Sequence, residues 1–282
     1  MKKFLNLAKS IIIYLILIYI ALMTLLYFFP QLFLYIPSNE VSNIEMARRN
    51  GYPAKLVEYK SEDGTDLYGW HTEPEGLHKG KIIVFMHGNA LNIEAFFPKV
   101  SPFNRYGYAT FMPEYRGFGG IKGKITDKNL VMDALAAVKE ANKLGYKNED
   151  IIVYGFSLGS HMAVSSVYTL KEQGKFEALV LEVPFNTLPS VVKAIFPVYM
   201  PFDILIRDKY DNISLIPYVD TRVLIMATKD DGIVPYYLAE DLYNHAVEPK
   251  DIIIYDAGVG HNDLYDVENF VVIRKWLEGN YL

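Results

Sequence analysis

Cysteine is missing from this sequence of 282 residues. Its absence excludes disulfide bonds, thiolate metal sites and a cysteine nucleophile, although it leaves the redox compartment open. A basic excess is missing too, because 28 Lys and Arg stand against 33 Asp and Glu. The net charge of −5 offers no basic surface to a polyanion, so we expect no nucleic-acid partner. With 51% hydrophobic residues, the chain is too apolar to be mainly disordered.

Features that divide a chain into domains are also lacking. After Pro37 the sequence has no repeat, no low-complexity tract and no Pro/Gly/Ser-rich linker, so residues 37–282 are predicted to form one domain. The histidines are scattered without the paired spacing of metal ligands, and there is no Gly-rich phosphate loop. We therefore expect neither a metal nor a cofactor. Nothing in the sequence indicates the oligomeric state.

Charge is absent from one long apolar run near the N-terminus, Ile11 to Phe29. As a helix this run would be about 28 Å long, which is enough to span the hydrocarbon of a bilayer. A cleaved signal peptide has a shorter apolar core that ends in a small-x-small site, and this run has neither property. The sequence therefore favours a retained signal anchor in residues 1–36 over a cleaved signal or a buried helix of a soluble protein.

The charges on either side of the apolar run predict its orientation. Lys2, Lys3 and Lys9 precede the run, whereas the first charged residues after it are Glu40 and Glu45. Because positive charge is retained on the cytoplasmic side, we expect a single-pass membrane protein with a cytoplasmic N-terminus and its main domain outside the cytoplasm.

After Pro37, short apolar runs alternate with helical patterns. Two strands, 55–59 and 67–72, flank the Asp63-Gly64 turn and are predicted to pair antiparallel. Helices are predicted over 130–144, with Thr126 or Asp127 as N-cap, and over 157–171, 236–245 and 263–277. Six runs are continuously apolar, as strands covered on both faces are: 82–86, 109–112, 151–154, 178–181, 223–226 and 252–255. The alternation predicts an α/β fold with a mostly parallel central sheet flanked by helices.

One of these runs leads directly into a G-x-S-x-G motif at residues 155–159. Between a strand and a helix, this motif is typical of a nucleophile elbow, a strained turn that presents Ser157 above the sheet. The two glycines provide room where a Cβ would strike neighbouring backbone, and the helix N-terminus favours a developing negative charge. An ordinary tight turn is the alternative interpretation.

Serine needs a base, and histidine is suited to this role by its near-neutral pKa. His261 is our candidate because it follows the last predicted strand in a Gly-rich loop, whereas His161 and His245 lie within predicted helices. A loop histidine that only caps the next helix is the alternative. The remaining histidines lie in the first strand pair or in early loops: His71, His78 and His87.

The acid that orients the base should follow a strand between the serine and the histidine. The loop after residues 223–226 offers Asp230 and Asp231. From the spacing to Ile233-Val234-Pro235 we choose Asp231, and Asp230 stays open as the alternative. Such a carboxylate holds the imidazole in one tautomer and stabilises the imidazolium.

Acyl transfer also requires backbone donors for an oxyanion. The strand at 82–86 ends in the turn His87-Gly88-Asn89-Ala90. We predict the amides of Leu158 and Asn89 as the oxyanion pair, because the residue after the nucleophile and the loop after this early strand supply the donors in hydrolases of this design. His87 is expected to order the loop rather than to act as the base.

In their order along the chain, these motifs resemble the α/β-hydrolase superfamily, and within it the membrane-anchored Bem46-like serine hydrolases related to the ABHD13 and ABHD17 groups. Two residues depart from the pattern, since Leu91 stands where Gly is commoner and Phe156 where Arg or Glu is commoner. Both bear on the substrate rather than on the three catalytic residues. The resemblance also rests on the anchor and on further motifs: Gly69-Trp70, Tyr115-Arg116-Gly117-Phe118-Gly119, Pro184-Phe185 and Gly260-His261-Asn262.

The resemblance implies a role for two further regions. Arg116 would lie close to the oxyanion region, although we favour a structural arginine that bonds loop carbonyls. Residues 184–217 lie where such folds insert a cap, here a small one. Its apolar stretch, 194–201, either lines an acyl pocket, touches lipid or simply covers the sheet. Four aromatic residues are predicted to wall a shallow apolar groove: Phe185, Phe196, Tyr199 and Phe202.

Taken together, these residues predict a serine hydrolase with a Ser157-His261-Asp231 triad. It would cleave a carboxylic ester or thioester of a small molecule or lipid through an acyl-enzyme. One alternative is a hydrolase-like membrane protein that binds or scaffolds without turnover, because fold does not determine function. Another is a serine peptidase or amidase.

Overall fold

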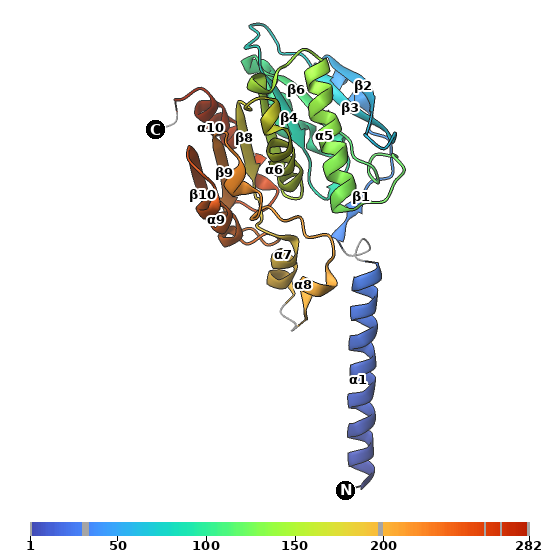
Figure 1. Cartoon of the computed structure of the whole chain (residues 1–282). Helices are drawn as coiled ribbons and strands as arrows, with labels where there is room; N and C mark the ends of the chain where they lie inside the picture. Colours follow the sequence, from blue (N-terminus) through green and yellow to red (C-terminus); the bar gives the residue numbers. More distant parts are fainter. Residues whose placement is uncertain (1, 30–33, 197–199, 257, 266, 281–282) are drawn as a thin grey trace.

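A twisted eight-stranded sheet forms the centre of the molecule in this computed structural model (Figure 1), which describes residues 2–29, 34–196, 200–256, 258–265 and 267–280. The strand order is β10-β9-β8-β7-β4-β6-β3-β2. The pairs β2–β3 and β3–β6 are antiparallel, and the other strand pairs of this sheet are parallel. The strands are β2 (Ala54–Lys60), β3 (Asp66–Thr72), β4 (Ile82–Met86), β6 (Ala109–Pro113), β7 (Ile151–Phe156), β8 (Ala178–Glu182), β9 (Val223–Thr228) and β10 (Lys250–Tyr255).

This architecture confirms the predicted α/β fold and its mostly parallel sheet. The strands of the sheet centre are buried along their whole length, because helices cover both faces and leave no side for alternating polar residues. One face packs against α5 (Asp127–Lys143), α6 (Gly159–Leu170) and α9 (Tyr236–His245). The other packs against α3 (Ile44–Arg49), α4 (Ile93–Val100) and α10 (Val267–Leu277).

The predicted helices differ from the observed ones mainly at their ends. Thr126 is the N-cap of α5, where its hydroxyl accepts a hydrogen bond from the Asn129 amide at 3.2 Å. The helix expected from residue 157 begins only at Gly159, because Ser157 has a φ of 52° and cannot belong to a right-handed helix. The helix expected from residue 263 starts instead as a 3₁₀ turn, Asp263–Tyr265, followed by α10.

The N-terminal helix α1 (Lys2–Phe28) extends away from the sheet (Figure 1), and it begins well before the uncharged run. Its segment Lys3–Phe28 is long and apolar enough to cross a membrane, and none of its most apolar window is buried against the protein. The interpretation as a core helix of a soluble protein is therefore wrong. A membrane anchor or a signal sequence accounts for such an exposed apolar helix.

Two short elements join this helix to the sheet. After α1, the strand β1 (Ile36–Pro37) pairs in parallel with β5 (Ala90–Leu91), which follows β4.

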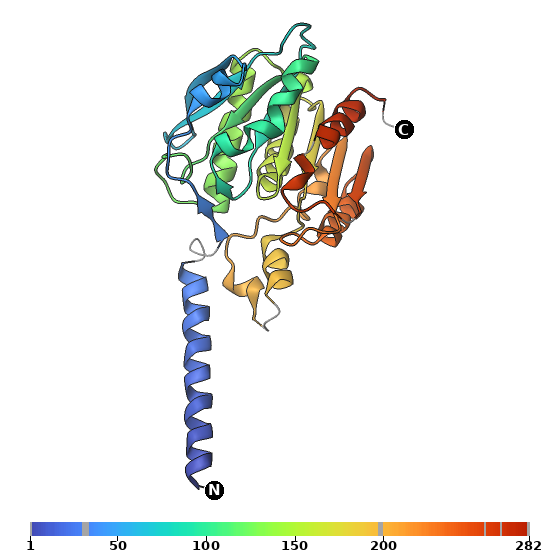
Figure 2. The ribbon, with the colours of Figure 1, turned by 180° about the vertical axis from the view of Figure 1, so that it is seen from behind.

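The region between β8 and β9 carries α7 (Leu188–Ile195) and α8 (Phe202–Leu205). These helices project from the sheet on the same side as the C-terminal end of α1 (Figure 2). Part of the predicted cap, residues 197–199, lies outside the described residues.

Arg116 forms a buried ion pair instead of the expected bonds to loop carbonyls. Its guanidinium donates to both carboxylate oxygens of Asp133 and also to Asp63, and the Arg116 and Asp133 side chains are 5% and 0% exposed. These carboxylates raise the pKa of Arg116, so it stays charged. The interpretation of Arg116 as a structural residue was therefore correct. Its partners are not loop carbonyls but the carboxylates of Asp133, in α5, and Asp63, in the turn between β2 and β3.

Replacing Arg116 should strongly destabilise the protein. Arg116→Met leaves Asp133 as an unpaired buried charge, which costs about 3–5 kcal/mol in the free energy of unfolding. Denaturant titration followed by circular dichroism measures the loss. The matched control is Lys60→Met, which breaks an exposed ion pair with Asp66 and should cost less than about 1 kcal/mol. Equal losses in the two variants would contradict a structural role for the buried pair.

Candidate active site

The turn between β7 and α6 holds Ser157 in a strained conformation. Its φ of 52° lies in the left-handed region, which a residue with a side chain adopts at a cost of about 1–2 kcal/mol. The flanking glycines make this turn possible, as predicted. A Cβ on Gly159 would lie 1.9 Å from the carbonyl oxygen of Met86, and one on Gly155 would lie 2.6 Å from the carbonyl oxygen of Gly159. No other residue fits these two positions without moving the backbone.

Ser157, His261 and Asp231 form one hydrogen-bonded chain, although they come from three separate loops. His261 Nε2 lies 3.1 Å from Ser157 Oγ, and His261 Nδ1 lies 2.7 Å from Asp231 Oδ2. The serine and the histidine are 7% and 9% exposed. With Nδ1 donating its proton to the carboxylate, Nε2 is left to accept the proton of the serine hydroxyl. The geometry thus places His261 where a base for Ser157 would have to lie, and Asp231 where it could orient that base.

Asp231 is held in place by the backbone that follows it. Its Oδ1 accepts hydrogen bonds from the amides of Ile233 and Val234, at 2.8 and 2.7 Å, and its side chain is 1% exposed. These bonds leave Oδ2 free to face the imidazole. The run Ile233-Val234-Pro235, which guided the choice between the two aspartates, therefore contacts the carboxylate directly.

Asp230, the neighbour of Asp231, contacts the backbone of the loop that carries His261. Its carboxylate accepts a hydrogen bond from the amide of Gly258, in the loop that carries His261. The hydroxyl of Thr228 donates to the carbonyl of Val259 at 2.6 Å, in the same loop. The ion pair and hydrogen bond to the imidazole nitrogen Nδ1 come from Asp231, whereas the carboxylate of Asp230 holds the backbone of the histidine loop. The two neighbouring aspartates thus point to different partners.

The loop after β4 lies beside the elbow, where an oxyanion would form. A Cβ on Gly88 would lie 3.6 Å from Cβ of Ser157. Among the residues that the structure describes, the amides of Asn89 and Leu158 have no hydrogen-bond acceptor. His87 is fully buried beneath this loop, with Nδ1 2.8 Å from the carbonyl oxygen of Gly88 and Nε2 3.0 Å from Glu114 Oε1. It orders the loop and lies out of reach of the solvent.

Known proteins resemble this chain in fold and in sequence. The fold matches an esterase of Pyrococcus furiosus, Pf2001, with a TM-score of 0.66 at 18% identity, over 86% of this chain and 96% of that one. A family model described as serine aminopeptidase, S33, matches residues 78–202. An uncharacterised protein of Mycobacterium tuberculosis, Rv2307c, is 33% identical over 210 residues, which cover 73% of this chain and 72% of that protein. The chain belongs to the α/β-hydrolase superfamily.

The resemblance to the α/β-hydrolase superfamily inferred from the motifs is therefore confirmed. The hydrolase is also 27% identical over 249 residues to the lysophosphatidylserine lipase ABHD12 of Gallus gallus, which covers 72% of this chain and 64% of that protein.

A buried ion pair behind the elbow of this α/β-hydrolase was not foreseen from the sequence. Lys99 Nζ lies 2.6 Å from Glu182 Oε1, and the side chains are 6% and 0% exposed. The carbonyl of Glu182 accepts the amide proton of Ser157 at 2.9 Å, and the hydroxyl of Tyr154 donates to the Glu182 carboxylate. Burial and this negative charge raise the pKa of Tyr154 well above its ordinary value. The pair fixes the strand on which the nucleophile turn rests.

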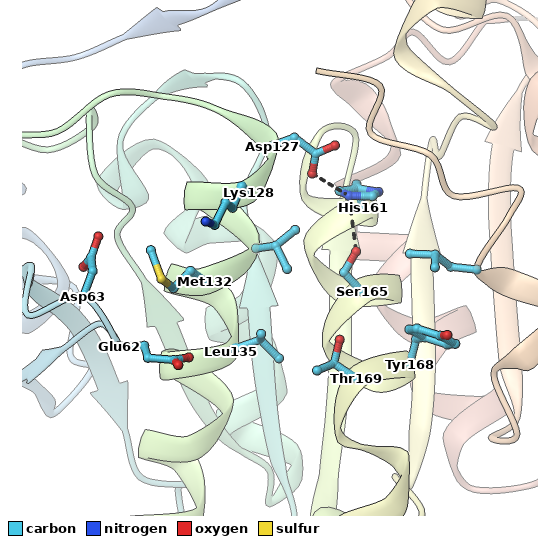
Figure 3. A pocket seen from close by; sticks show the side chains of 12 residues that line it. Glu62, Asp63, Asp127, Lys128, Met132, Leu135, His161, Ser165, Tyr168 and Thr169 are labelled. Atoms are coloured by element: carbon cyan, nitrogen blue, oxygen red, sulfur yellow. Dashed lines mark hydrogen bonds and ion pairs between the residues drawn. The ribbon is translucent and has the colours of Figure 1, made fainter. Parts of the chain in front are cut away.

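A second serine, histidine and aspartate meet in the hydrolase, between α5 and α6 (Figure 3). His161 Nε2 lies 2.9 Å from Asp127 Oδ1 and 3.2 Å from Ser165 Oγ, beside a cavity of about 700 Å³. Both partners share one ring nitrogen, while Nδ1 faces Asn212 Oδ1 at 3.0 Å. The carboxylate therefore does not orient the ring for the serine. Ser165 also lies within α6, where the backbone amides are used by the helix and offer no oxyanion site.

The His161 group instead ties the cap region to α5 and α6. Burial alone would raise the pKa of Asp127, but the hydrogen bond and the charge of His161 lower it below its ordinary value. The second oxygen of Asp127 accepts the amide proton of Tyr210 at 3.0 Å, in the segment that returns from α8. The exclusion of His161 as the base, made from its place in a helix, agrees with these contacts.

Proposed function

We propose that this hydrolase cleaves a carboxylic ester or thioester through an acyl-enzyme on Ser157. The observation that supports this best is the continuous chain of hydrogen bonds from Ser157 Oγ through His261 to Asp231. A serine in a strained turn, a histidine with one free nitrogen and a buried acid are the three parts that nucleophilic acyl transfer requires.

In the first half of the reaction, Ser157 Oγ attacks the carbonyl carbon while its proton passes to His261 Nε2. The carbonyl oxygen becomes an oxyanion, to which the amides of Leu158 and Asn89 donate. The imidazolium then protonates the leaving alkoxide or thiolate, the bond to the leaving group breaks, and the acyl group stays on Ser157. Asp231 stabilises the transient positive charge of His261 throughout.

In the second half, a water molecule takes the place of the leaving group. His261 accepts a proton from the water as its oxygen attacks the acyl carbon. The tetrahedral intermediate collapses, His261 returns the proton to Ser157 Oγ, and the carboxylic acid leaves. No further group is consumed, so the cycle needs only the acyl donor and water.

The test is covalent labelling by a fluorophosphonate probe, in competition with an ester, a thioester and an amide of one acyl group. Labelling should be slowed by the ester or thioester at lower concentration than by the amide. The family model named for an aminopeptidase favours the amide as the second candidate. Preference for the amide would replace the proposed reaction by a peptidase or amidase reaction, and absence of labelling would favour a binding protein without turnover.

The acyl groove should be shallow, so that the benefit of a longer acyl chain ends early. Four aromatic residues were predicted to line this groove. Phe185 and Phe202 are buried in hydrophobic clusters, Phe196 is half exposed, and Tyr199 lies outside the described residues. Each methylene that is fully buried adds about 0.8 kcal/mol, or roughly fourfold in kcat/KM. We expect kcat/KM of soluble nitrophenyl esters to rise over the first few carbons and then to level off.

This measurement uses a chain that begins at Leu34 and esters kept below micelle-forming concentrations. A start at Pro37 would remove the bonds of Leu34 and Ile36 to Asn89. A steady rise of kcat/KM through palmitate would contradict the shallow groove.

We propose a single-pass anchor with the catalytic domain outside the cytoplasm, on the basis of the three lysines in the first part of α1, before its uncharged run, and the acidic residues after the helix. The full chain should stay in membranes washed with alkaline carbonate. Protease added outside intact cells should digest the domain. A domain that is protected until the membrane is lysed would show the opposite orientation.

A further inference from the structure

The helices α7 and α8 carry apolar side chains that point away from the protein. Ile204, in α8, is 71% exposed, and Ile195 and Phe196, at the end of α7, are 42% and 52% exposed. Beneath them, Val192 and Phe202 are buried in a small hydrophobic cluster that is separate from the two main cores. An apolar surface of this kind on a small projecting element is typical of a contact with a partner or with lipid.

The anchor helix lies against this same element. Leu26, near the end of α1, and Leu34, just after it, pack on the cluster that underlies α7 and α8. The centroid of the Tyr27 ring lies 5.1 Å from the guanidinium of Arg207, two residues after the end of α8. In both views α7 and α8 project along the upper turns of α1 and beyond the rest of the domain (Figures 1 and 2). The exposed side chains of α7 and α8 therefore lie beside the last turns of α1, at the level where this helix would leave a bilayer.

The candidate active site is attached to the same point. The side-chain amide of Asn89 donates to the carbonyl of Leu34 at 2.8 Å, and the amide of Ile36 donates to the carbonyl of Asn89 at 3.0 Å. The chain from Phe29 to Leu34 can span at most about 18 Å even when fully extended. The loop that carries a proposed oxyanion donor is thus held close to the end of the membrane span.

We propose that the cap surface, defined by Ile195, Phe196 and Ile204, rests in the interface of the bilayer that α1 crosses, and that the enzyme acts on esters resident in that bilayer. The second part rests on the proposed function of Ser157. The shallow groove takes the ester bond and its first carbons, while the rest of the acyl chain stays among the lipids. Such a substrate never has to leave the membrane completely.

The charges beside the cap surface indicate which lipids it meets. Lys193 and Arg207 are exposed on α7 and after α8, and Asp203 is exposed next to Ile204. Because both signs are present, apolar contact rather than attraction to anionic headgroups should dominate. Vesicles of zwitterionic phosphatidylcholine are therefore sufficient as a test membrane, and added salt should leave the contact intact.

The first experiment measures the contact itself, without any activity. The full chain with Ile204→Trp is reconstituted in phosphatidylcholine vesicles with and without brominated acyl chains. The native Trp70 and Trp276 are buried and contribute equally to every variant. The introduced indole should be quenched by the brominated lipid. The control is Leu77→Trp, since Leu77 is 86% exposed in the loop before β4, at the opposite end of the sheet, and should not be quenched. Equal quenching of the two, or none at position 204, would overturn the proposed surface.

The second experiment measures the consequence for the substrate. Ile204→Glu should lower the rate on nitrophenyl palmitate dissolved in the vesicles by about tenfold, the loss expected when one apolar side chain leaves the interface. Its rate on nitrophenyl acetate in water should equal that of the native chain, and Leu77→Glu should change neither rate. Equal falls on both esters, or no fall on the palmitate, would overturn the lipid-ester inference. No hydrolysis of either ester by the native chain, with quenching intact, would refute the function of Ser157 but not the surface.

Discussion

Ser157→Ala should abolish ester hydrolysis and fluorophosphonate labelling while the protein stays folded. The change removes one oxygen atom, and the methyl group that remains fits the space of the original Cβ. We expect kcat to fall by at least about 10⁴-fold, because the other parts of such a site retain little catalysis without the nucleophile. The measurements are initial rates on a short nitrophenyl ester and gel fluorescence after labelling, with circular dichroism as the check on folding.

Ser165→Ala is the matched control. Ser165 belongs to the other group of serine, histidine and aspartate and lies in the same helix, α6, that follows the elbow. The substitution Ser165→Ala removes the same oxygen atom from a buried serine. We expect it to leave the labelling and the rate of hydrolysis within about threefold of the native values. Residual activity of Ser157→Ala near the native rate, or loss of labelling in Ser165→Ala instead, would move the nucleophile to the other group.

Elements set by local pattern were predictable from the sequence. The central strands are short and continuously apolar, and such runs indicate strands of a sheet that is covered on both faces. The elbow was also predictable, because strand, glycines and helix follow one another within a few residues. His261 and Asp231 could be chosen since each lies in a loop directly after a strand, where parallel strands bring distant loops together.

Interactions between distant residues could not be predicted in this way. Lys99 and Glu182 form an ion pair behind the elbow, but the sequence around either residue does not indicate which residue it contacts. A glutamate that ends an apolar strand is the one signal that could have drawn attention to Glu182. The same holds for Arg116, whose loop could be recognised but whose partner Asp133 lies in a helix with an ordinary amphipathic pattern.

The two departures from the family pattern have physical counterparts in the structure. Leu91 has a φ of 59°, a left-handed conformation in which glycine is favoured, and this explains why glycine is commoner there. The centroid of the Phe156 ring is 4.3 Å from the ammonium of Lys99 and 5.4 Å from the centroid of the His261 ring. The replacement beside the nucleophile therefore contacts the proposed base, and its effect is not confined to the substrate.

Asp231→Asn should be far more damaging to catalysis than Asp230→Asn. An asparagine at position 231 can donate its amide proton to His261 Nδ1, which favours the tautomer that carries its proton on Nε2. That tautomer cannot accept the proton of Ser157, and losses of about 10⁴-fold in kcat are expected when an orienting acid is changed in this way. The stability of the fold should change little, since the Asn carbonyl can still accept from Ile233 and Val234.

Asp230→Asn makes the same change one residue earlier and so provides the comparison. Its carbonyl can still accept the amide proton of Gly258, and the histidine loop keeps its anchor. We expect kcat to remain within about tenfold of the native value, because a neutral acceptor replaces a charged one in a single hydrogen bond. Rates on a short ester and the thermal unfolding midpoint should be measured for both variants side by side. The opposite ranking would assign the orienting acid to Asp230, and equal losses would mean that the position of the histidine loop, rather than its tautomer, limits the rate.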